Sequence, residues 1–346
     1  MYPVGPHGGK MPDPVIIHKN RYVYRRLPEN AKYRLQSPTM SANTLTKVYD
    51  KSGVVIPKTP KKVLVFDLDE TIGYFTDLHI IWNSVFYSEH TLNYPTENEL
   101  DGVFAQIFNV YPEFLRYGMI SILIFLRRKI TSGETGPIFL YTNNQCRYPE
   151  WVRLLLHYIE KKVAGNTTMG DIEHSMFAKP VCAFKINNRV IETLRTTTTK
   201  TYSDFISCTK LPKTTEICFV DDTYYKNMDK SSVYYIQPPS YYHGLSHAEI
   251  ESRFYTHIQP VLYREKYISA SYIFPRLSFP YPDPIIRPYK HPYNEHVYHR
   301  ILYYIKEFFI MTVSSIHTRR VRVHIGRFSR KLRTIHPASF NDESPK

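Results

Sequence analysis

Pairs of carboxylates follow two short apolar runs in this chain. Asp67 and Asp69 come two residues apart directly after the first run, and Asp221 and Asp222 are adjacent directly after another. Buried carboxylates are unfavourable unless a cation or hydrogen bonds compensate them. Mg²⁺ is a suitable cation, because it prefers carboxylate and carbonyl oxygens and keeps waters at its other ligand positions. The pattern therefore predicts a Mg²⁺ site.

Groups that suit a phosphate occur elsewhere in the chain. Thr142 and the two asparagines after it follow a third apolar run, and their hydroxyl and amide groups can hold phosphoryl oxygens. Lys200 is a candidate counter-charge, with Lys185 and Lys210 as rivals. Together the acidic, hydroxyl and ammonium groups predict a site that binds Mg²⁺ and a phosphate.

The elements that must position these residues are predicted to be short buried strands that alternate with helices. Residues 112–129 and 149–162 have apolar residues at helical spacing and end in cations, as helices do. The alternation predicts an α/β fold with a Rossmann-like, doubly wound parallel sheet, whose active site lies at the carboxyl ends of the strands. Residues 72–111 leave room for a small insertion. The predicted strands are 63–66, 138–141, 217–220 and 233–236.

In their order along the chain, these motifs resemble those of the haloacid dehalogenase superfamily of phosphotransferases. The string VLVFDLDET at residues 63–71 is more closely similar to the phosphatases that act on the C-terminal domain of RNA polymerase II, which carry a DLDET signature. The resemblance covers residues 61–245, roughly half of the chain.

The resemblance implies a role for each matching side chain. Asp67 would be the nucleophile that forms an aspartyl-phosphate, and Asp69 the general acid that later acts as the base for water. Thr71 would support the turn and orient Asp69. Thr142 would bind the phosphoryl oxygens, and Lys200 would neutralise developing negative charge.

The resemblance also implies the ligands of Mg²⁺. They would be Asp67, the backbone carbonyl of Asp69, and Asp221 or Asp222. The chain departs from the family at three places. Ile-Gly-Tyr follows DLDET where the family has Leu-Val-His, and Thr-Asn-Asn stands where the family often has Thr-Ala-Ser. The usual Lys-Asp-Leu of the third motif is at best Lys-Thr-Tyr-Ser-Asp-Phe, which begins at Lys200. The first departure concerns the adjoining substrate contacts.

Positive charge lies in the flanks of the chain. The chain has 45 Lys and Arg and 31 Asp and Glu. Residues 1–60 contain 10 basic and 3 acidic residues, and residues 241–346 contain 16 basic and 8 acidic residues. The middle part, residues 61–240, contains 19 basic and 20 acidic residues and is nearly neutral. We therefore predict a basic N-terminal arm (1–60), a phosphatase domain (61–245) and a basic, Tyr-rich extension (246–346). The near-neutral core with Tyr-rich flanks is also similar to the versions carried by large DNA viruses.

Within the extension, residues 294–316 are predicted to form an amphipathic helix, and residues 319–333 form a tail with seven Lys and Arg. Basic flanks of this kind are expected to contact nucleic acid or an acidic partner.

Membrane insertion and secretion are not expected. The apolar stretches are shorter than the roughly 20 residues of a membrane span, and the N-terminus has no apolar signal region. The four cysteines form no CxxC pair and no metal-binding spacing, so we expect free thiols. A reducing intracellular location, nuclear or cytoplasmic, follows from that expectation.

The expected function is a Mg²⁺-dependent phosphatase acting on phosphoserine or phosphothreonine of a protein. Two alternatives stay open. The same chemistry would serve a polynucleotide end phosphatase, which the basic flanks favour. A non-catalytic peptide-binding module could also keep the fold, although it would have no need of both Asp67 and Asp69.

Overall fold

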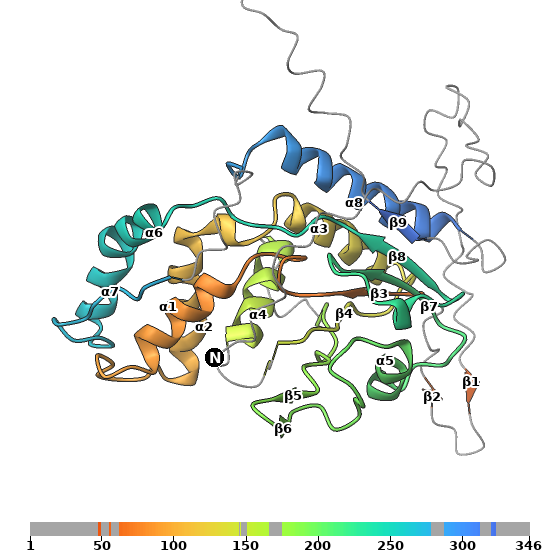
Figure 1. Ribbon diagram of the computed structural model, residues 1–346, viewed down its shortest axis with the longest axis horizontal. Helices are drawn as coiled ribbons and strands as arrows, with labels where there is room; N and C mark the ends of the chain where they lie inside the picture. Colours follow the sequence, from red (N-terminus) through yellow and green to blue (C-terminus); the bar gives the residue numbers. More distant parts are fainter. Residues whose placement is uncertain are drawn as a thin grey trace, which may run out of the picture. The chain divides into compact units, whose positions relative to one another are not determined.

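A computed structural model of the chain describes residues 62–144, 146, 151–165, 175–277 and 287–311, together with the backbone of three short strands (Figure 1). The chain divides into two compact units, Met1–Lys58 and Thr59–Lys346. In the first unit, β1 (Val48–Tyr49) and β2 (Val55–Ile56) form an antiparallel pair. The rest of the predicted arm and most of the predicted basic tail lie outside the described residues.

The second unit is built on a parallel β-sheet. Its strands have the order β4-β3-β7-β8, and a short strand, β9 (Arg320–Arg322), pairs in parallel with β8 at one edge. All four predicted strands are present. They are β3 (Lys62–Phe66), β4 (Phe139–Leu140), β7 (Glu216–Val220) and β8 (Val233–Gln237).

Alternate side chains of the strands enter two different cores. Leu64 and Phe66 of β3 pack in one hydrophobic cluster, and Val63 and Val65 pack in the other together with Phe205. Because successive side chains of a strand point to opposite faces, both faces of this sheet are covered. Figure 1 shows α5 (Tyr202–Thr209) and α8 (Pro292–Ile310) on opposite sides of the strands. The structure is therefore α/β, with a parallel sheet flanked by helices.

The stretch that was predicted to hold a small insertion forms two helices. These are α1 (Thr76–Phe86) and α2 (Glu97–Val110), and both carry fully buried side chains of the main core, including Trp82 and Phe104. A Thr96–Glu99 capping box begins α2, which is a favourable helix start. The stretch therefore adds to the core of the unit.

The prediction of one helix over 112–129 is wrong. A short 3₁₀ turn, Pro112–Phe114, is followed by an extended residue, and α3 (Met119–Thr131) begins only after Gly118. Gly118 has φ of +77°, a left-handed conformation that interrupts a right-handed helix and that glycine adopts readily. The next predicted helix is present as α4 (Trp151–Ala164).

The helices after residue 246 pack on the same core. They are α6 (His247–Arg253), a π-helical turn (Phe254–Ile258), α7 (Gln259–Arg264) and α8. The predicted amphipathic helix is thus confirmed as α8, and it is held to β3 by Lys62. The Nζ atom of Lys62 donates hydrogen bonds to the carbonyls of Phe308 (2.7 Å) and Met311 (2.6 Å) at the end of α8. No helix in the described part of the chain has the length and apolar character of a membrane span.

Candidate functional site

The predicted carboxylates meet at the carboxyl end of the sheet. Residue Phe66 of β3 lies opposite Val220 of β7, and the N–H of Asp67 donates a hydrogen bond to the carbonyl of Val220 (2.9 Å). This register brings Asp67 next to Asp221 and Asp222. One oxygen from each of these three buried side chains lies within 4.8 Å of the others.

Lys200 contacts two of the three carboxylates. Its Nζ atom lies 2.5 Å from Oδ1 of Asp67 and 2.7 Å from Oδ2 of Asp221, and its side chain is 1% exposed. Lys200 directly precedes Thr201, the N-cap of α5, whose hydroxyl accepts a hydrogen bond from the N–H of Asp204. The start of α5 therefore sets the position of Lys200.

The rival lysines do not take this position. Lys185 lies on β5 (Lys185–Ile186), which forms an exposed hairpin with β6 (Arg189–Val190), and Lys210 is the exposed C-cap of α5. Within the described part of the chain, neither lysine has a hydrogen bond or ion pair with the carboxylate cluster.

The cluster holds more negative than positive charge. One ammonium group, Lys200, faces three carboxylates. Burial raises the pKa of Asp67 and of Asp221, although Lys200 acts to lower both. Burial alone would lower the pKa of Lys200, but Asp67 and Asp221 outweigh it and raise that pKa. A further cation would compensate the remaining charge, so the three aspartates could hold a metal ion.

Thr71 joins the loops that follow β3 and β7. Its hydroxyl donates to Oδ1 of Asp222 and accepts the N–H of Asp222, both at 3.0 Å. Thr71 was expected to orient Asp69. Both hydrogen bonds of the Thr71 hydroxyl are instead formed with Asp222. The other carboxylate oxygen of Asp222 accepts a hydrogen bond from the Ser240 hydroxyl (2.7 Å), and the side chain of Gln237 donates to its backbone carbonyl (2.9 Å).

A tight turn follows β3 and carries Asp69. Glu70 has φ of +60° and its N–H bonds to the carbonyl of Gly73 (2.6 Å). A Cβ atom at Gly73 would lie 2.2 Å from the carbonyl oxygen of Phe114, so the close backbone approach requires glycine. Buried Arg116 fixes the turn by donating to the carbonyls of Glu70 and Thr71.

Asp69 faces the loop after β4. The side-chain amide of Asn144 donates a hydrogen bond to Oδ2 of Asp69 (3.2 Å). Burial, and next the negative charge of Asp67, raise the pKa of Asp69 to about 7. A carboxyl group with such a pKa can both donate and accept a proton near neutral pH.

Thr142 is 1% exposed and lies at the end of β4. Its hydroxyl accepts the N–H of Asn144 (3.0 Å), and its carbonyl accepts a hydrogen bond from Arg195 (3.0 Å). Arg195 also donates to the carbonyl of Cys182 (2.7 Å) and to the side chain of Asn143 (3.0 Å). This buried arginine therefore joins the loop after β4 to the segment that contains Cys182.

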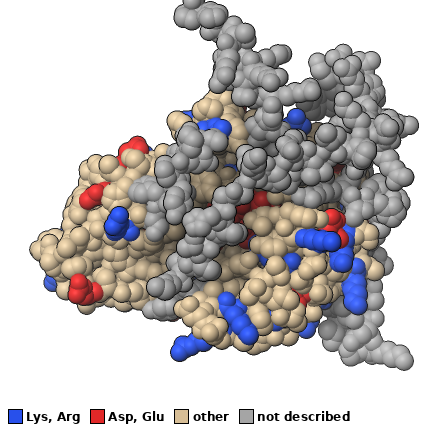
Figure 2. Space-filling model, in the orientation of Figure 1, with Lys and Arg blue, Asp and Glu red and all other residues tan. Residues whose placement is uncertain are grey.

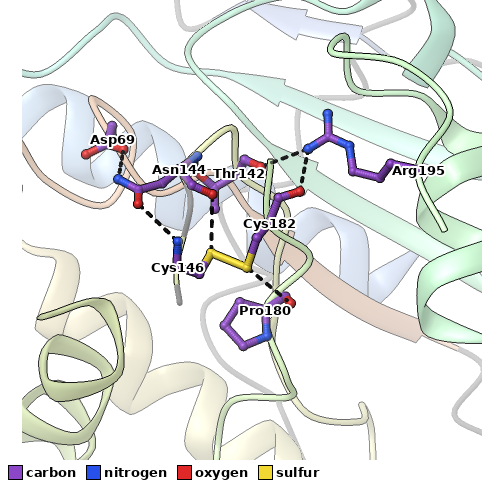
Figure 3. Close-up of a disulfide and its surroundings, with 7 residues drawn as sticks. All are labelled: Asp69, Thr142, Asn144, Cys146, Pro180, Cys182 and Arg195. Atoms are coloured by element: carbon purple, nitrogen blue, oxygen red, sulfur yellow. Dashed lines mark hydrogen bonds between the residues drawn. A yellow bond between two sulfur atoms is a disulfide. The ribbon is translucent and has the colours of Figure 1, made fainter. Parts of the chain in front are cut away.

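The expectation of four free thiols is wrong for one pair. Cys146 and Cys182 form a disulfide, and their Cα atoms are 5.8 Å apart. Figure 3 shows this bond beside Asn144, with Arg195 on the other side of Thr142. Cys208 and Cys218 are free. The expected reducing location depended on free thiols, so it loses that support and stays a prediction.

Four polar residues of the site were not predicted: Gln237, Ser240, Arg195 and Arg116. Gln237 and Ser240 follow the fourth apolar run, and their position after that run is the sequence signal that points to them. Arg195 stands alone in a Thr-rich stretch, and Arg116 lies in the predicted helix 112–129. No spacing in the sequence distinguishes either arginine from an exposed one.

Comparisons of the chain with protein-family models, with curated proteins and with solved structures gave no match. The chemistry of the site must therefore be argued from its geometry. The described residues provide a buried carboxylate in contact with an ammonium group, a second carboxyl group with a raised pKa, and oxygen ligands for a cation.

Proposed function

We propose that the protein is a Mg²⁺-dependent phosphatase that acts through an aspartyl-phosphate on phosphoserine or phosphothreonine of a protein. The observation that carries the proposal is the position of Lys200. Its Nζ atom touches Asp67 and Asp221 at 2.5 and 2.7 Å. An ammonium group there favours the ionised form of Asp67, which is the nucleophilic form, and gives positive charge for the oxygens of a phosphoryl group.

In the first step, a carboxylate oxygen of Asp67 attacks the phosphorus. A bond from Asp67 to phosphorus forms, and the bond from phosphorus to the serine or threonine oxygen breaks. Asp69 donates its proton to that leaving oxygen, and a pKa near 7 leaves a large fraction of Asp69 protonated at neutral pH. Asn144 holds this carboxyl group from the loop after β4.

In the second step, Asp69, now ionised, takes a proton from water. The water oxygen attacks the phosphorus of the aspartyl-phosphate, and the bond from phosphorus to Asp67 breaks. Inorganic phosphate leaves and Asp67 is regenerated. Lys200 and the hydroxyl of Thr142 are the groups proposed to hold the phosphoryl oxygens during both steps.

The cation that best fits the cluster is Mg²⁺. Asp67, Asp221 and Asp222 offer only oxygen atoms, the ligands that a hard cation prefers. The ligands would be Asp67, the backbone carbonyl of Asp69, and Asp221 or Asp222. When bound, Mg²⁺ would neutralise charge on the phosphoryl oxygens.

A macromolecular substrate is favoured by the surroundings of the site. Helices α1 and α2 pack into the core and do not form a separate cap over the strand ends in the described part of the chain. Figure 2 shows Lys and Arg side chains over the β5–β6 hairpin and beside α5. The exposed cations of this region include Lys185, Arg189, Lys210 and Lys213. Positive surface near a site increases the local concentration of a negatively charged polymer.

The same exposed cations favour a second candidate, a polynucleotide end phosphatase. Phosphate release should be compared between a phosphoserine heptad peptide and a 3′-phosphorylated oligonucleotide, with Asp69→Asn as the control. The proposal expects faster release from the peptide and loss of that release in the variant. Faster release from the oligonucleotide would favour the second candidate. Release from neither substrate, with wild-type protein, would contradict both.

A further inference from the structure

The disulfide lies next to a residue that contacts the proposed general acid. Cys146 is two positions after Asn144, and its partner Cys182 lies in the segment that runs beside the loop after β4. Backbone hydrogen bonds pair the two segments: Thr142 donates to Val181 (3.0 Å), and Ala183 donates to Asn144 (2.9 Å). The Cys146–Cys182 bond links the same two segments covalently.

Asn144 is fixed by hydrogen bonds on every side. Its side-chain amide donates to Asp69 (3.2 Å), and its side-chain carbonyl accepts the N–H of Cys146 (3.3 Å). Its backbone N–H donates to the hydroxyl of Thr142 (3.0 Å). Figure 3 shows that the residue holding the side-chain carbonyl of Asn144 is the same Cys146 that forms the disulfide.

Arg195 holds the neighbouring backbone independently of the disulfide. It donates to the carbonyls of Thr142 (3.0 Å) and Cys182 (2.7 Å), and it is 2% exposed. Breaking the sulfur–sulfur bond would therefore leave Thr142 and the backbone of Asn144 in place. It would release Cys146, whose N–H holds the side-chain carbonyl of Asn144. Reduction of the disulfide should therefore disturb the position of the Asp69 carboxyl group and leave the cluster of Asp67, Asp221 and Asp222 unchanged.

A small reductant can reach the bond. Cys146 is half-buried, and both cysteines line a cavity of about 410 Å³. Described residues that also line it include Arg153, His157 and Lys179.

We infer that the Cys146–Cys182 disulfide is a redox control of the positioning residue Asn144. In the oxidised chain, the disulfide holds Asn144 against Asp69. In the reduced chain, the side chain of Asn144 is released and protonation of the leaving oxygen becomes slower. This inference rests on the proposed role of Asp69.

The redox step is an ordinary thiol–disulfide exchange. A dithiol attacks the disulfide, the bond between the sulfur atoms of Cys146 and Cys182 breaks, and two thiols form. The dithiol loses two electrons and two protons and becomes a disulfide. An oxidised dithiol returns the chain to its starting form by the reverse reaction.

The test compares two substrates that differ in how much they need a general acid. Serine oxygen is a poor leaving group and needs a proton, whereas the p-nitrophenolate ion leaves without one. Wild-type protein is folded without reductant, treated with a dithiol and then reoxidised, and the disulfide is followed by alkylation and mass spectrometry. The quantity compared is kcat/KM, which reports the first step and does not include the later attack of water that both substrates share. We expect reduction to lower kcat/KM for the phosphoserine peptide about tenfold, with a change of less than about twofold for p-nitrophenyl phosphate, and reoxidation to restore it.

Three variants complete the test. Cys146→Ser should behave like the reduced chain and be insensitive to dithiol. Asn144→Ala should show the same selective loss without reduction. Cys208→Ser, which removes a free thiol on α5, should keep the full response. Recovery of peptide hydrolysis when the reduced wild-type protein is reoxidised tests the inference even if a variant does not fold.

Several results would overturn the inference. They are equal kcat/KM values before and after reduction, an equal fall in kcat/KM with both substrates, and the lack of a Cys146–Cys182 bond in protein folded without reductant. Failure of the proposed function looks different. In that case oxidised wild-type protein hydrolyses neither substrate faster than Asp67→Asn does, and the inference falls with it.

Discussion

Lys200 and Asp67 form a buried ion pair, with Nζ 2.5 Å from Oδ1 and side chains that are 1% and 13% exposed. The pair joins the carboxyl end of β3 to the residue before the N-cap of α5. It fixes one positive charge in a cluster that otherwise contains only carboxylates. The properties of this cluster can be measured by removing its members separately.

Replacement of Lys200 should reduce both activity and stability. In Lys200→Met, Asp67 and Asp221 lose their buried partner, which typically costs about 3–5 kcal/mol of unfolding free energy. The loss should be smaller in Mg²⁺ than in EDTA, because a cation replaces part of the missing charge. Thermal unfolding in both buffers measures this, with Lys210→Met, at an exposed position, as control. An equal loss in both buffers would contradict the account.

Addition of Mg²⁺ should stabilise the folded chain. Binding to the native state adds about 2.7 kcal/mol at 100 times the Kd, so Tm should rise with Mg²⁺ concentration. Asp222→Asn removes one charge of the cluster and should reduce that rise. Asp229→Asn is the matched control, since Asp229 bonds to Tyr224 outside the cluster. The same rise in both variants would exclude Asp222 as a ligand.

Arg195 should contribute strongly to stability. Arg195→Met keeps an unbranched side chain but leaves the carbonyls of Thr142 and Cys182 without this donor. An unsatisfied buried group costs about 1–3 kcal/mol, so we expect a total loss of about 3 kcal/mol in urea unfolding. The same substitution at exposed Arg189 should change stability by less than about 0.5 kcal/mol. Similar values for the two variants would show that the hydrogen bonds of Arg195 do not matter.

Gly73 should tolerate no side chain. In Gly73→Ala the added Cβ would meet the carbonyl oxygen of Phe114 at 2.2 Å and the Phe75 ring at 2.5 Å. Displacing these groups should cost about 1–3 kcal/mol and disturb the turn that carries Asp69. Gly102→Ala, in α2 with no atom within 4 Å of the added Cβ, should instead gain up to about 1 kcal/mol. Calorimetry of the two variants tests the opposite signs.

The strands and their shared edge could be predicted from the sequence. Each buried strand is a short apolar run, and parallel strands end at one edge of a sheet, so Asp67 and Asp221 were expected at the same edge. That β3 and β7 are neighbours in the sheet is a finding of the structure. The proximity of Lys200 followed only as one choice among three lysines. Lys200 reaches the cluster because α5 begins at Tyr202. The spacing of apolar residues does not locate the start of a helix to within one residue.

Other features depend on tertiary contacts that leave no sequence pattern. The Thr71–Asp222 and Asn144–Asp69 hydrogen bonds join loops whose paths are set by packing. The disulfide joins Cys146 to Cys182 across α4, and pairing of cysteines cannot be deduced from spacing alone. The break before α3 depends on the backbone conformation of Gly118, in a stretch whose apolar residues have helical spacing.

The central claim is that Asp67 is the nucleophile of a Mg²⁺-dependent phosphatase. The most direct test is the rate of phosphate release from p-nitrophenyl phosphate by wild-type protein and by Asp67→Asn, each in Mg²⁺ and in EDTA. The account predicts release by the wild type in Mg²⁺, and a rate at least roughly a thousandfold lower for the variant and for the wild type in EDTA. Wild-type release in Mg²⁺ no faster than that of Asp67→Asn would contradict the account.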